Sequence, residues 1–324
     1  MRAKFMALIA GVALVAACAS GLHAQPYPSR SLRIVVPFAP GGSTDIFARL
    51  IGERLAAALG QPVVIENRPG AGGNIGAEIV AKSPPDGYTL LMATTGVMAI
   101  NSSLYRNLNY DAAKDLEPVC YIASITNVLV VPADSPLKSV GDLVAYAKAS
   151  PGKLTFASSG AGSSTHMSAE LFKAMAGIDL VHIPYKGSGQ ALPDLLSGRV
   201  SMMFENMPGA VSYIQSGKLR ALAVTGLNRT PALPEVKTVA ESGVAGYESL
   251  SWSGIAVASG TPRDVIARLN REINAILTTP EMRQKLAEQG AEAIGGTPEA
   301  FAEQIRRERE KWSRVVRDAG IVAN

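Results

Sequence analysis

Short runs of aliphatic and β-branched residues alternate with amphipathic stretches along most of this chain, and this alternation constrains the fold more than any other feature. Residues 32–36 (LRIVV) are expected to form a buried strand, whereas residues 44–59 repeat their apolar side chains at helical spacing. Strands that alternate with helices are typical of α/β domains with mainly parallel sheets. At 324 residues, the chain is long enough for about two such domains.

The same patterns locate the other elements. Strands are predicted at 32–36, 62–66, 88–92, 128–131, 153–157, 180–183, 200–204, 219–224 and 255–257. Helices are predicted at 44–59, 75–82, 139–149, 164–175, 190–196, 209–215, 264–277, 281–289 and 298–318.

The beginning of the chain has the pattern of a secretory signal peptide. Arg2 and Lys4 precede an unbroken small and apolar run at 5–17, which is too short for a stable membrane-spanning helix. We expect residues 1–24 to be removed by cleavage before Gln25. The small residues before Cys18 also resemble a bacterial lipobox, so a lipoprotein anchored at Cys18 is the alternative. Either route leads to the periplasm.

Composition narrows the function further. Only 18% of the residues are charged and the net charge is +4 with no charge run, so nucleic-acid binding is not expected. No histidine pair has metal-ligand spacing and no Gly-x-Ser-x-Gly motif occurs, so we expect no catalytic residue, metal or cofactor. His166, which follows a Ser/Thr run, leaves an exported hydrolase as the alternative. His182 and Cys120 lie in apolar runs and are expected to be core residues.

Two segments share the order strand, glycine-rich loop and helix, and they supply most of the candidate ligand-binding residues. A helix N-terminus presents unpaired N–H groups to an anion, glycine lets a ligand approach the backbone, and hydroxyls add donors. A plain strand-to-helix connection is the alternative for either loop. The candidates are Gly41, Gly42, Ser43 and Thr44 in the first loop and Ser159, Gly162, Ser163, Ser164 and Thr165 in the second.

Neither loop contains Lys or Arg, and neither is a nucleotide-binding signature. We therefore expect backbone N–H groups, hydroxyls and water to hold an anion. Gly42 is expected to permit close approach and to need a dihedral angle that other residues avoid. Ser43 or Thr44 is expected to cap the helix that follows.

Five further candidates follow other predicted strands. Tyr185 and Lys186 place a cation where a carboxylate could use it, although a solvated lysine in a turn is the alternative. Glu205 and Asn206 could bind a ligand amine or hydroxyl, or instead cap the next helix. We also include Thr95 among the candidate ligand-binding residues.

Several long motifs resemble those of the Bug family, also called the TctC-like receptors of the tripartite tricarboxylate transporter group. The resemblance covers essentially the whole mature chain. The matching motifs are PFAPGGSTD at 37–45, ENRPGAGG at 66–73, PPDGYTL at 84–90, YKG at 185–187 and GKLRALAVT at 217–225.

This resemblance implies a two-lobed periplasmic binding protein with a Venus-flytrap fold, in which each lobe is a mainly parallel sheet flanked by helices. Lobe 1 is expected to be discontinuous, comprising 25–126 and 248–324, with lobe 2 at 127–247. The hinge is expected near 124–127 and 245–249.

The resemblance also implies a small organic acid as ligand, bound through a carboxylate at 41–44 in one lobe and by the loop at 159–165 in the other. We expect a monomer that works with transporter membrane subunits or with a sensory receptor. Glu205 departs from the family pattern, in which Asp is expected, and its longer side chain would shrink the pocket.

Overall fold

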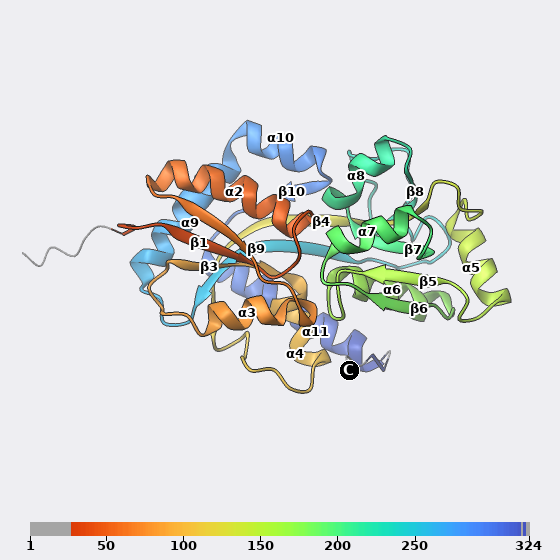
Figure 1. Ribbon diagram of the computed structural model, residues 1–324, viewed down its shortest axis with the longest axis horizontal. Helices are drawn as coiled ribbons and strands as arrows, with labels where there is room; N and C mark the ends of the chain where they lie inside the picture. Colours follow the sequence, from red (N-terminus) through yellow and green to blue (C-terminus); the bar gives the residue numbers. More distant parts are fainter. Residues whose placement is uncertain (1–26, 319, 322–324) are drawn as a thin grey trace, which may run out of the picture.

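The chain folds into two α/β lobes that share one long strand. The computed structural model describes residues 27–318, 320 and 321. The predicted signal peptide and Cys18 lie outside these residues. Figure 1 shows the two lobes side by side, with β4 (Leu116–Pro132) and β9 (Leu250–Ala258) running from one toward the other. Within the described part of the chain, no helix is both long and apolar enough to cross a membrane.

Lobe 1 is built on the strand order β2-β1-β3-β9-β4, with β10 (Ala291–Ala293) also paired to β4. The strands β1 (Leu32–Val36), β2 (Val63–Asn67) and β3 (Thr89–Thr94) pair in parallel. β9 is antiparallel to both β3 and β4, so β4 runs in the same direction as β1 to β3.

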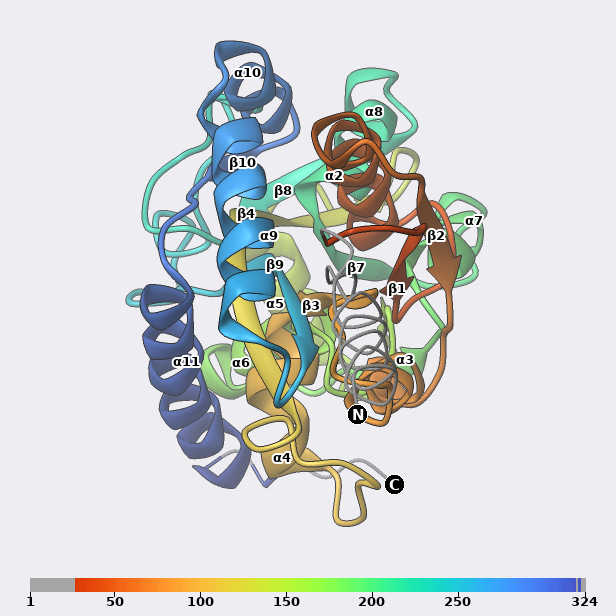
Figure 2. The same cartoon turned by 90° about the vertical axis from the view of Figure 1, so that its left-hand side faces the viewer.

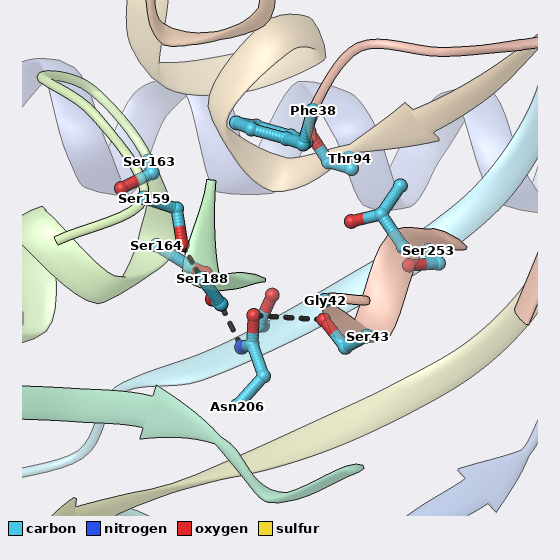
Figure 3. Close-up of a pocket in the computed structure, with 12 residues that line it drawn as sticks. Phe38, Gly42, Ser43, Thr94, Ser159, Ser163, Ser164, Ser188, Asn206 and Ser253 are labelled. Atoms are coloured by element: carbon cyan, nitrogen blue, oxygen red, sulfur yellow. Dashed lines mark hydrogen bonds between the residues drawn. The ribbon is translucent and has the colours of Figure 1, made fainter. Parts of the chain in front are cut away.

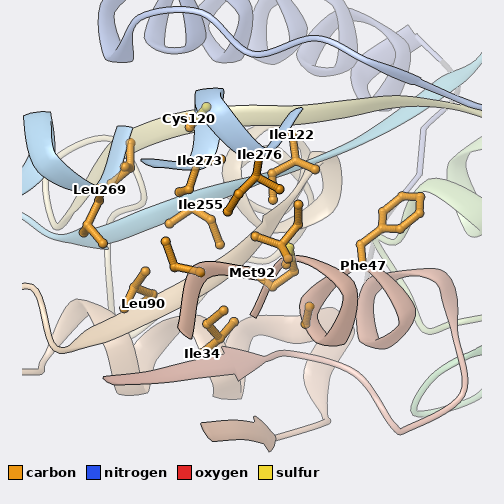
Figure 4. Packing of buried hydrophobic residues seen from close by; sticks show 14 of the residues in the cluster. Ile34, Phe47, Leu90, Met92, Cys120, Ile122, Ile255, Leu269, Ile273 and Ile276 are labelled. Atoms are coloured by element: carbon orange, nitrogen blue, oxygen red, sulfur yellow. The ribbon is translucent and has the colours of Figure 1, made fainter. Parts of the chain in front are cut away.

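Helices cover both faces of this sheet because alternate strand residues point to opposite sides. On one face, α2 (Ser43–Leu59), α9 (Arg263–Thr278) and α10 (Pro280–Glu288) pack on an aliphatic core. Figure 4 shows this core, which includes Ile34, Phe47 and Cys120. Cys120 is fully buried, as the sequence predicts.

The other face of lobe 1 is covered by α3 (Asn74–Ala81) and α11 (Pro298–Asp318). Figure 2 shows α11 along the outer edge of the molecule. Its apolar side chains Phe301, Ile305 and Trp312 are buried, whereas most of its charged residues remain exposed. The π-helix at Gly96–Ile100 and the short helix α4 (Asn101–Leu104) continue from β3.

Lobe 2 repeats the design. β5 (Thr155–Ser158) pairs in parallel with β6 (Val181–Pro184) and β7 (Met202–Asn206), while β7 and β8 (Leu219–Val224) are antiparallel to the second half of β4. One face packs on α5 (Val140–Ala149) and α6 (Ser164–Ala176), and the other on α7 (Ser188–Leu196) and α8 (Met207–Gln215). The predicted two-lobed α/β fold is therefore confirmed.

The predicted helices and strands all have counterparts, and the nine predicted helices end within two residues of the observed bounds. The main difference is β4, a strand of 17 residues of which only the segment 128–131 was predicted. Its first half contains Pro118, Cys120 and Tyr121 in mixed order, without the alternation that marks a half-buried strand.

Candidate functional site

Four helices begin around one small cavity between the lobes. α2 comes from lobe 1, and α6, α7 and α8 come from lobe 2. Figure 3 shows their first residues facing one another across the cavity. The cavity has a volume of about 20 Å³. Its lining consists of Phe38, Gly42, Ser43, Thr44, Thr94, Ser159, Ser163, Ser164, Ser188, Asn206, Ser251 and Ser253.

The lining is polar but carries no charged side chain. Hydroxyls dominate it, and the first N–H groups of α2, α6 and α7 have no intrahelical acceptor. The positive ends of several helix dipoles therefore point toward one region. Such a site favours an anion.

The loop before α2 is held by a carboxylate. Asp45 Oδ2 accepts a hydrogen bond from the N–H of Gly41 at 3.1 Å, and Arg49 and Asn67 donate to the same carboxylate. Burial raises the pKa of Asp45, but the hydrogen bonds from Arg49, Gly41 and Asn67 outweigh it, and the net pKa is lowered. Asp45 therefore remains charged and fixes the turn.

Two expectations for this loop are wrong. Gly42 is the N-cap of α2, so Ser43 and Thr44 lie inside the helix and do not cap it. Gly42 also has an extended backbone (φ −87°, ψ 171°) that any residue can adopt. The left-handed angle belongs to Gly41, at φ +88°. A side chain at Gly42 would instead meet Ser188 Cβ at 3.4 Å.

Several hydroxyls at the start of α6 form hydrogen bonds with the loop that precedes the helix. Ser163 caps α6 by accepting from the N–H of His166, and its Oγ donates to the carbonyl of Gly160 at 2.7 Å. Thr165 Oγ1 accepts from the N–H of Ser159 at 2.8 Å. Ser159 Oγ lines the cavity and is hydrogen-bonded to Ser188 Oγ, the first hydroxyl of α7, at 2.8 Å.

Asn206 connects the two lobes at the cavity. Ser43 Oγ, in lobe 1, donates to Asn206 Oδ1 at 3.1 Å. The Asn206 amide nitrogen donates to Asn127 Oδ1 and, at 3.4 Å, to Ser164 Oγ. Asn206 thus orients a hydroxyl from each lobe.

Glu205 lies directly beneath this cluster and is fully buried. When Glu205 is ionised, its Oε2 accepts from Ser188 Oγ at 2.7 Å, whereas its Oε1 has no hydrogen-bond partner. Burial raises the pKa of Glu205 to about 8, against the opposing hydrogen bonds from Ser188 and the N–H of Asn206. Glu205 does not line the cavity.

Six other predicted residues also lie outside the cavity lining. Gly162 donates its N–H to His166 Nδ1 at 3.2 Å. Thr95 Oγ1 accepts from the N–H of Trp252, and Tyr185 donates to Asp194. The other predicted residues outside the lining are Gly41, Thr165 and Lys186. The Lys186 side chain is exposed, and its backbone carbonyl accepts a hydrogen bond from the N–H of Ala39 at 3.0 Å.

Sequence reasoning missed Phe38, Thr94, Ser188, Ser251 and Ser253, which also line the cavity. Position along the strands could have revealed three of them. Thr94 ends β3, where ligands gather in α/β sheets. Ser251 and Ser253 are two residues apart on β9 and therefore share a face. Thr94 Oγ1 is buried and has no hydrogen-bond partner.

The buried His166 and the half-buried His182 stack on each other with ring centroids 4.1 Å apart. Burial lowers the pKa of His166 to about 3 and that of His182 to about 4, so both are neutral at pH 7. Ser158 Oγ lies 2.6 Å from His182 Nε2, but neither residue lines the cavity. Among the residues that the structure describes, no group of three or more His, Cys, Asp or Glu side chains could hold a metal ion.

Comparison with known proteins gives consistent matches. The model of the tripartite tricarboxylate transporter family receptor matches residues 47–321. Protein BugT of Bordetella pertussis is 40% identical over 318 residues, covering 98% of each chain.

Two solved structures extend the likeness to the fold. R. palustris Rpa4515 with adipate is 42% identical, with a TM-score of 0.89, and the match covers 91% of this chain and 99% of that one. MatC (Rpa3494) from Rhodopseudomonas palustris with bound malate is 33% identical, with a TM-score of 0.86, over 90% of this chain and 100% of that one.

The matches extend over nearly the whole chain in sequence and in fold, and they confirm the resemblance to Bug and TctC-like proteins. Proteins of this family are periplasmic and act as solute-binding receptors. The chain therefore belongs to the family of tripartite tricarboxylate transporter receptors.

Proposed function

We propose that this receptor captures a small organic acid in the cleft between its lobes, through a carboxylate, and presents it to a tripartite tricarboxylate-type transporter. The observation that carries the proposal is the convergence of helix N-termini from both lobes on a hydroxyl-rich cavity without charged side chains. The relatives described with adipate and with malate support a carboxylate ligand.

The carboxylate would accept hydrogen bonds from the first N–H groups of α2 and from the hydroxyls around them. Thr94 Oγ1 is a natural donor because it is buried at the cavity without a partner. Phe38 offers an apolar wall for the methylene groups of such a ligand. Water would complete the contacts that a short acid leaves open.

Ligand entry requires the lobes to separate. A cavity of about 20 Å³ holds roughly one water molecule, which is too little for adipate or malate. We place the hinge at 124–127, inside β4, and at 245–249, before β9. This divides the mature chain into lobe 1 (25–126 and 248–324) and lobe 2 (127–247).

The contacts between the lobes include hydrogen bonds that water can replace, beside an apolar cluster in which Met167 of lobe 2 packs on Ile100, Leu104 and Trp312 of lobe 1. Ser43 donates to Asn206, the N–H of Ala39 donates to the carbonyl of Lys186, and Tyr105 donates to the carbonyl of Ala161 at 2.8 Å. We propose that the receptor exchanges between an open and a closed form, and that a bound ligand adds contacts only in the closed form.

We further propose that binding occurs without turnover. The Ser–His pair found among the described residues, Ser158 and His182, lies outside the cavity lining, and the low pKa of His182 makes it a weak base. The rival function, an exported hydrolase, requires a nucleophile that reaches the substrate.

Export completes the proposal. We propose that a signal peptide is removed before Gln25 and that the mature receptor is a periplasmic monomer, with lipid attachment at Cys18 as the alternative. Intact-mass measurement of the mature protein separates the two, because an attached lipid adds mass. Cys18→Ser is a second test, since it would release only a lipid-anchored form from the membrane. A mass that includes residues 1–24 would contradict cleavage.

A thermal-shift screen tests the central proposal. Adipate, malate and other carboxylates of graded length are compared with their amides, and a true ligand is expected to raise the melting temperature by mass action. Mass spectrometry of the recovered compound then distinguishes a receptor, which returns it unchanged, from an enzyme. Equal shifts with acids and amides would contradict carboxylate recognition.

A further inference from the structure

Glu205 is a buried carboxyl group that the protein satisfies on one side only. It lies on β7 and is fully shielded from solvent. Its Oε2 is hydrogen-bonded to Ser188 Oγ, but its Oε1 has no partner. Gly209 packs so closely that an added Cβ would lie 2.4 Å from Oε1. An ionised carboxylate in such a place is costly, whereas a protonated one is not.

Glu205 is connected to the cavity through two hydroxyls. Its Oε2 lies 2.7 Å from Ser188 Oγ, and Ser188 Oγ lies 2.8 Å from Ser159 Oγ. Ser188 and Ser159 both line the cavity, and Glu205 does not. Each hydroxyl has one proton to donate, so the chain of three groups must point either toward the cavity or away from it.

Building on the proposed carboxylate capture, we propose that Glu205 is a positioning residue whose bound proton orients Ser188 and Ser159 so that Ser159 donates into the cavity. In this state Glu205 donates to Ser188 Oγ, and Ser188 donates to Ser159 Oγ. The Ser159 proton is then free for a ligand carboxylate.

Loss of the proton to solvent reverses the chain. Ser159 then donates to Ser188, and Ser188 donates to the ionised Glu205. Ser159 turns lone pairs toward the cavity, where they repel a carboxylate. A second negative charge also lies only two hydroxyls away from the ligand, so both consequences weaken binding.

Within the described part of the chain, Glu205 forms no ion pair with a Lys or Arg side chain. Side chains alternate along β7, so Glu205 shares the α7 and α8 face with Met203, whereas Phe204 faces α6. The titratable and charged groups on the packed elements are His166, Glu170 and Lys173 on α6, His182 on β6, Tyr185, Lys186 and Asp194 at or near α7, Tyr213 on α8, and Asp45 and Arg49 on α2.

These groups are engaged elsewhere or lie at a distance. Asp45 pairs with Arg49, Glu170 with Lys173, and Asp194 with Arg199. Burial, the largest influence, raises the pKa of Glu205 to about 8, and only the hydrogen bonds from Ser188 and Asn206 oppose it. Glu205 is therefore mostly protonated at pH 7 and mostly ionised at pH 9.

The first experiment needs no ligand. Carbon-13 NMR of glutamate-labelled protein, with Glu205→Gln to assign the signal, follows the Glu205 carboxyl from pH 5 to pH 10. We expect it to remain protonated at pH 7 and to titrate near pH 8. An ionised Glu205 at pH 6.5 would overturn the proposal, whatever the receptor binds.

The second experiment uses adipate as the probe in calorimetric titrations at pH 7 and pH 9. If only the protonated form binds, the affinity falls about tenfold, because about one molecule in ten carries the proton at pH 9. Glu205→Gln, whose amide is a permanent donor to Ser188, is expected to bind equally at both values.

Two matched variants complete the design. Glu170→Gln removes an acid from the opposite face of β7 and should keep the wild-type pH profile. Ser188→Ala breaks the chain and should leave weak binding with a smaller pH dependence than wild type, because only the charge of ionised Glu205 then acts on the ligand. If the affinity of Glu205→Gln for adipate falls from pH 7 to pH 9 as much as that of wild type does, the proposal is overturned. Absence of carboxylate binding at every pH, with the NMR titration as expected, instead counts against the proposed function.

Discussion

At the residue scale, hydroxyls, amides and backbone groups take the place that a charged side chain often fills in an anion site. The Lys186 side chain is exposed, and its backbone carbonyl contacts the other lobe by accepting a hydrogen bond from the N–H of Ala39. Ser43, by contrast, lines the cavity and donates to Asn206. The cavity thus keeps neutral donors that do not depend on one flexible cation.

Replacing Ser43 by alanine is expected to weaken carboxylate binding about fivefold. The change removes one hydrogen bond between the lobes, worth about 1 kcal/mol in the closed form. Lys186→Ala is expected to change the affinity less than twofold. Calorimetric titration of both variants checks this, and a reversed order of effects would assign the carboxylate to the lysine.

The contribution of Glu205 to the stability of the folded receptor should fall as the pH rises from about 4.5 to 8. The pKa of Glu205 is raised from its usual 4.5 to about 8, so in this window the Glu205 side chain holds a proton in the native state that it has lost in the unfolded state. This contribution to the free energy of unfolding falls by at most about 1.4 kcal/mol per pH unit and levels off above pH 8.

Urea unfolding of wild type and Glu205→Gln at several pH values isolates this contribution. The free energy of unfolding of Glu205→Gln should increase relative to that of wild type as the pH rises from about 4.5 to 8. A difference that does not vary with pH would mean that Glu205 is ionised in the native state.

At the element scale, the start of α7 forms part of the contact between the lobes. An added Cβ at Gly189 would lie 2.1 Å from the carbonyl oxygen of Pro40 in lobe 1. The backbone of Gly189 has no positive φ, so alanine is conformationally acceptable there. Glycine is needed for close approach of the two loops and not for local geometry.

Gly189→Ala is therefore expected to hinder closure without unfolding lobe 2. The affinity for the carboxylate should fall at least tenfold, while the circular dichroism spectrum remains that of wild type. Gly141→Ala, in α5, is the matched control because its added Cβ meets nothing closer than Ser139 Oγ at 3.6 Å. Wild-type affinity in Gly189→Ala would show that the lobes close differently.

At the scale of the whole molecule, β4 and the chain entering β9 are the connections between the lobes. β4 pairs with β9 and β10 in lobe 1 and with β7 and β8 in lobe 2. A second cavity of about 620 Å³ lies against this region, with Thr126 and the loop 226–231 in its lining. Both lobes contribute to it, so lobe movement must change its shape.

Small-angle X-ray scattering is expected to show a smaller radius of gyration when a saturating carboxylate is added. The physical reason is that the ligand gains contacts from both lobes only in the closed form. Gly189→Ala should contract less than wild type at equal saturation. Identical profiles with and without ligand would contradict closure by lobe movement.

The sequence by itself determined the element order, the helix bounds and the two glycine-rich loops, because these depend on local periodicity and turn chemistry. It also identified the family through long contiguous motifs. The inner strand β4 was recognised only in part, since its two halves face different surroundings and share no single alternation.

Which polar groups meet at the cavity depends on tertiary packing, and the sequence did not predict it in full. Ser251 and Ser253 reach it from a strand far along the chain, and the α7 hydroxyl of Ser188 links it to Glu205. The raised pKa of Glu205 is equally a tertiary property, because a carboxyl group titrates according to the solvent and partners that packing leaves it. Local sequence specifies a helix start, but the convergence of several such starts on one anion site follows from how the two lobes pack.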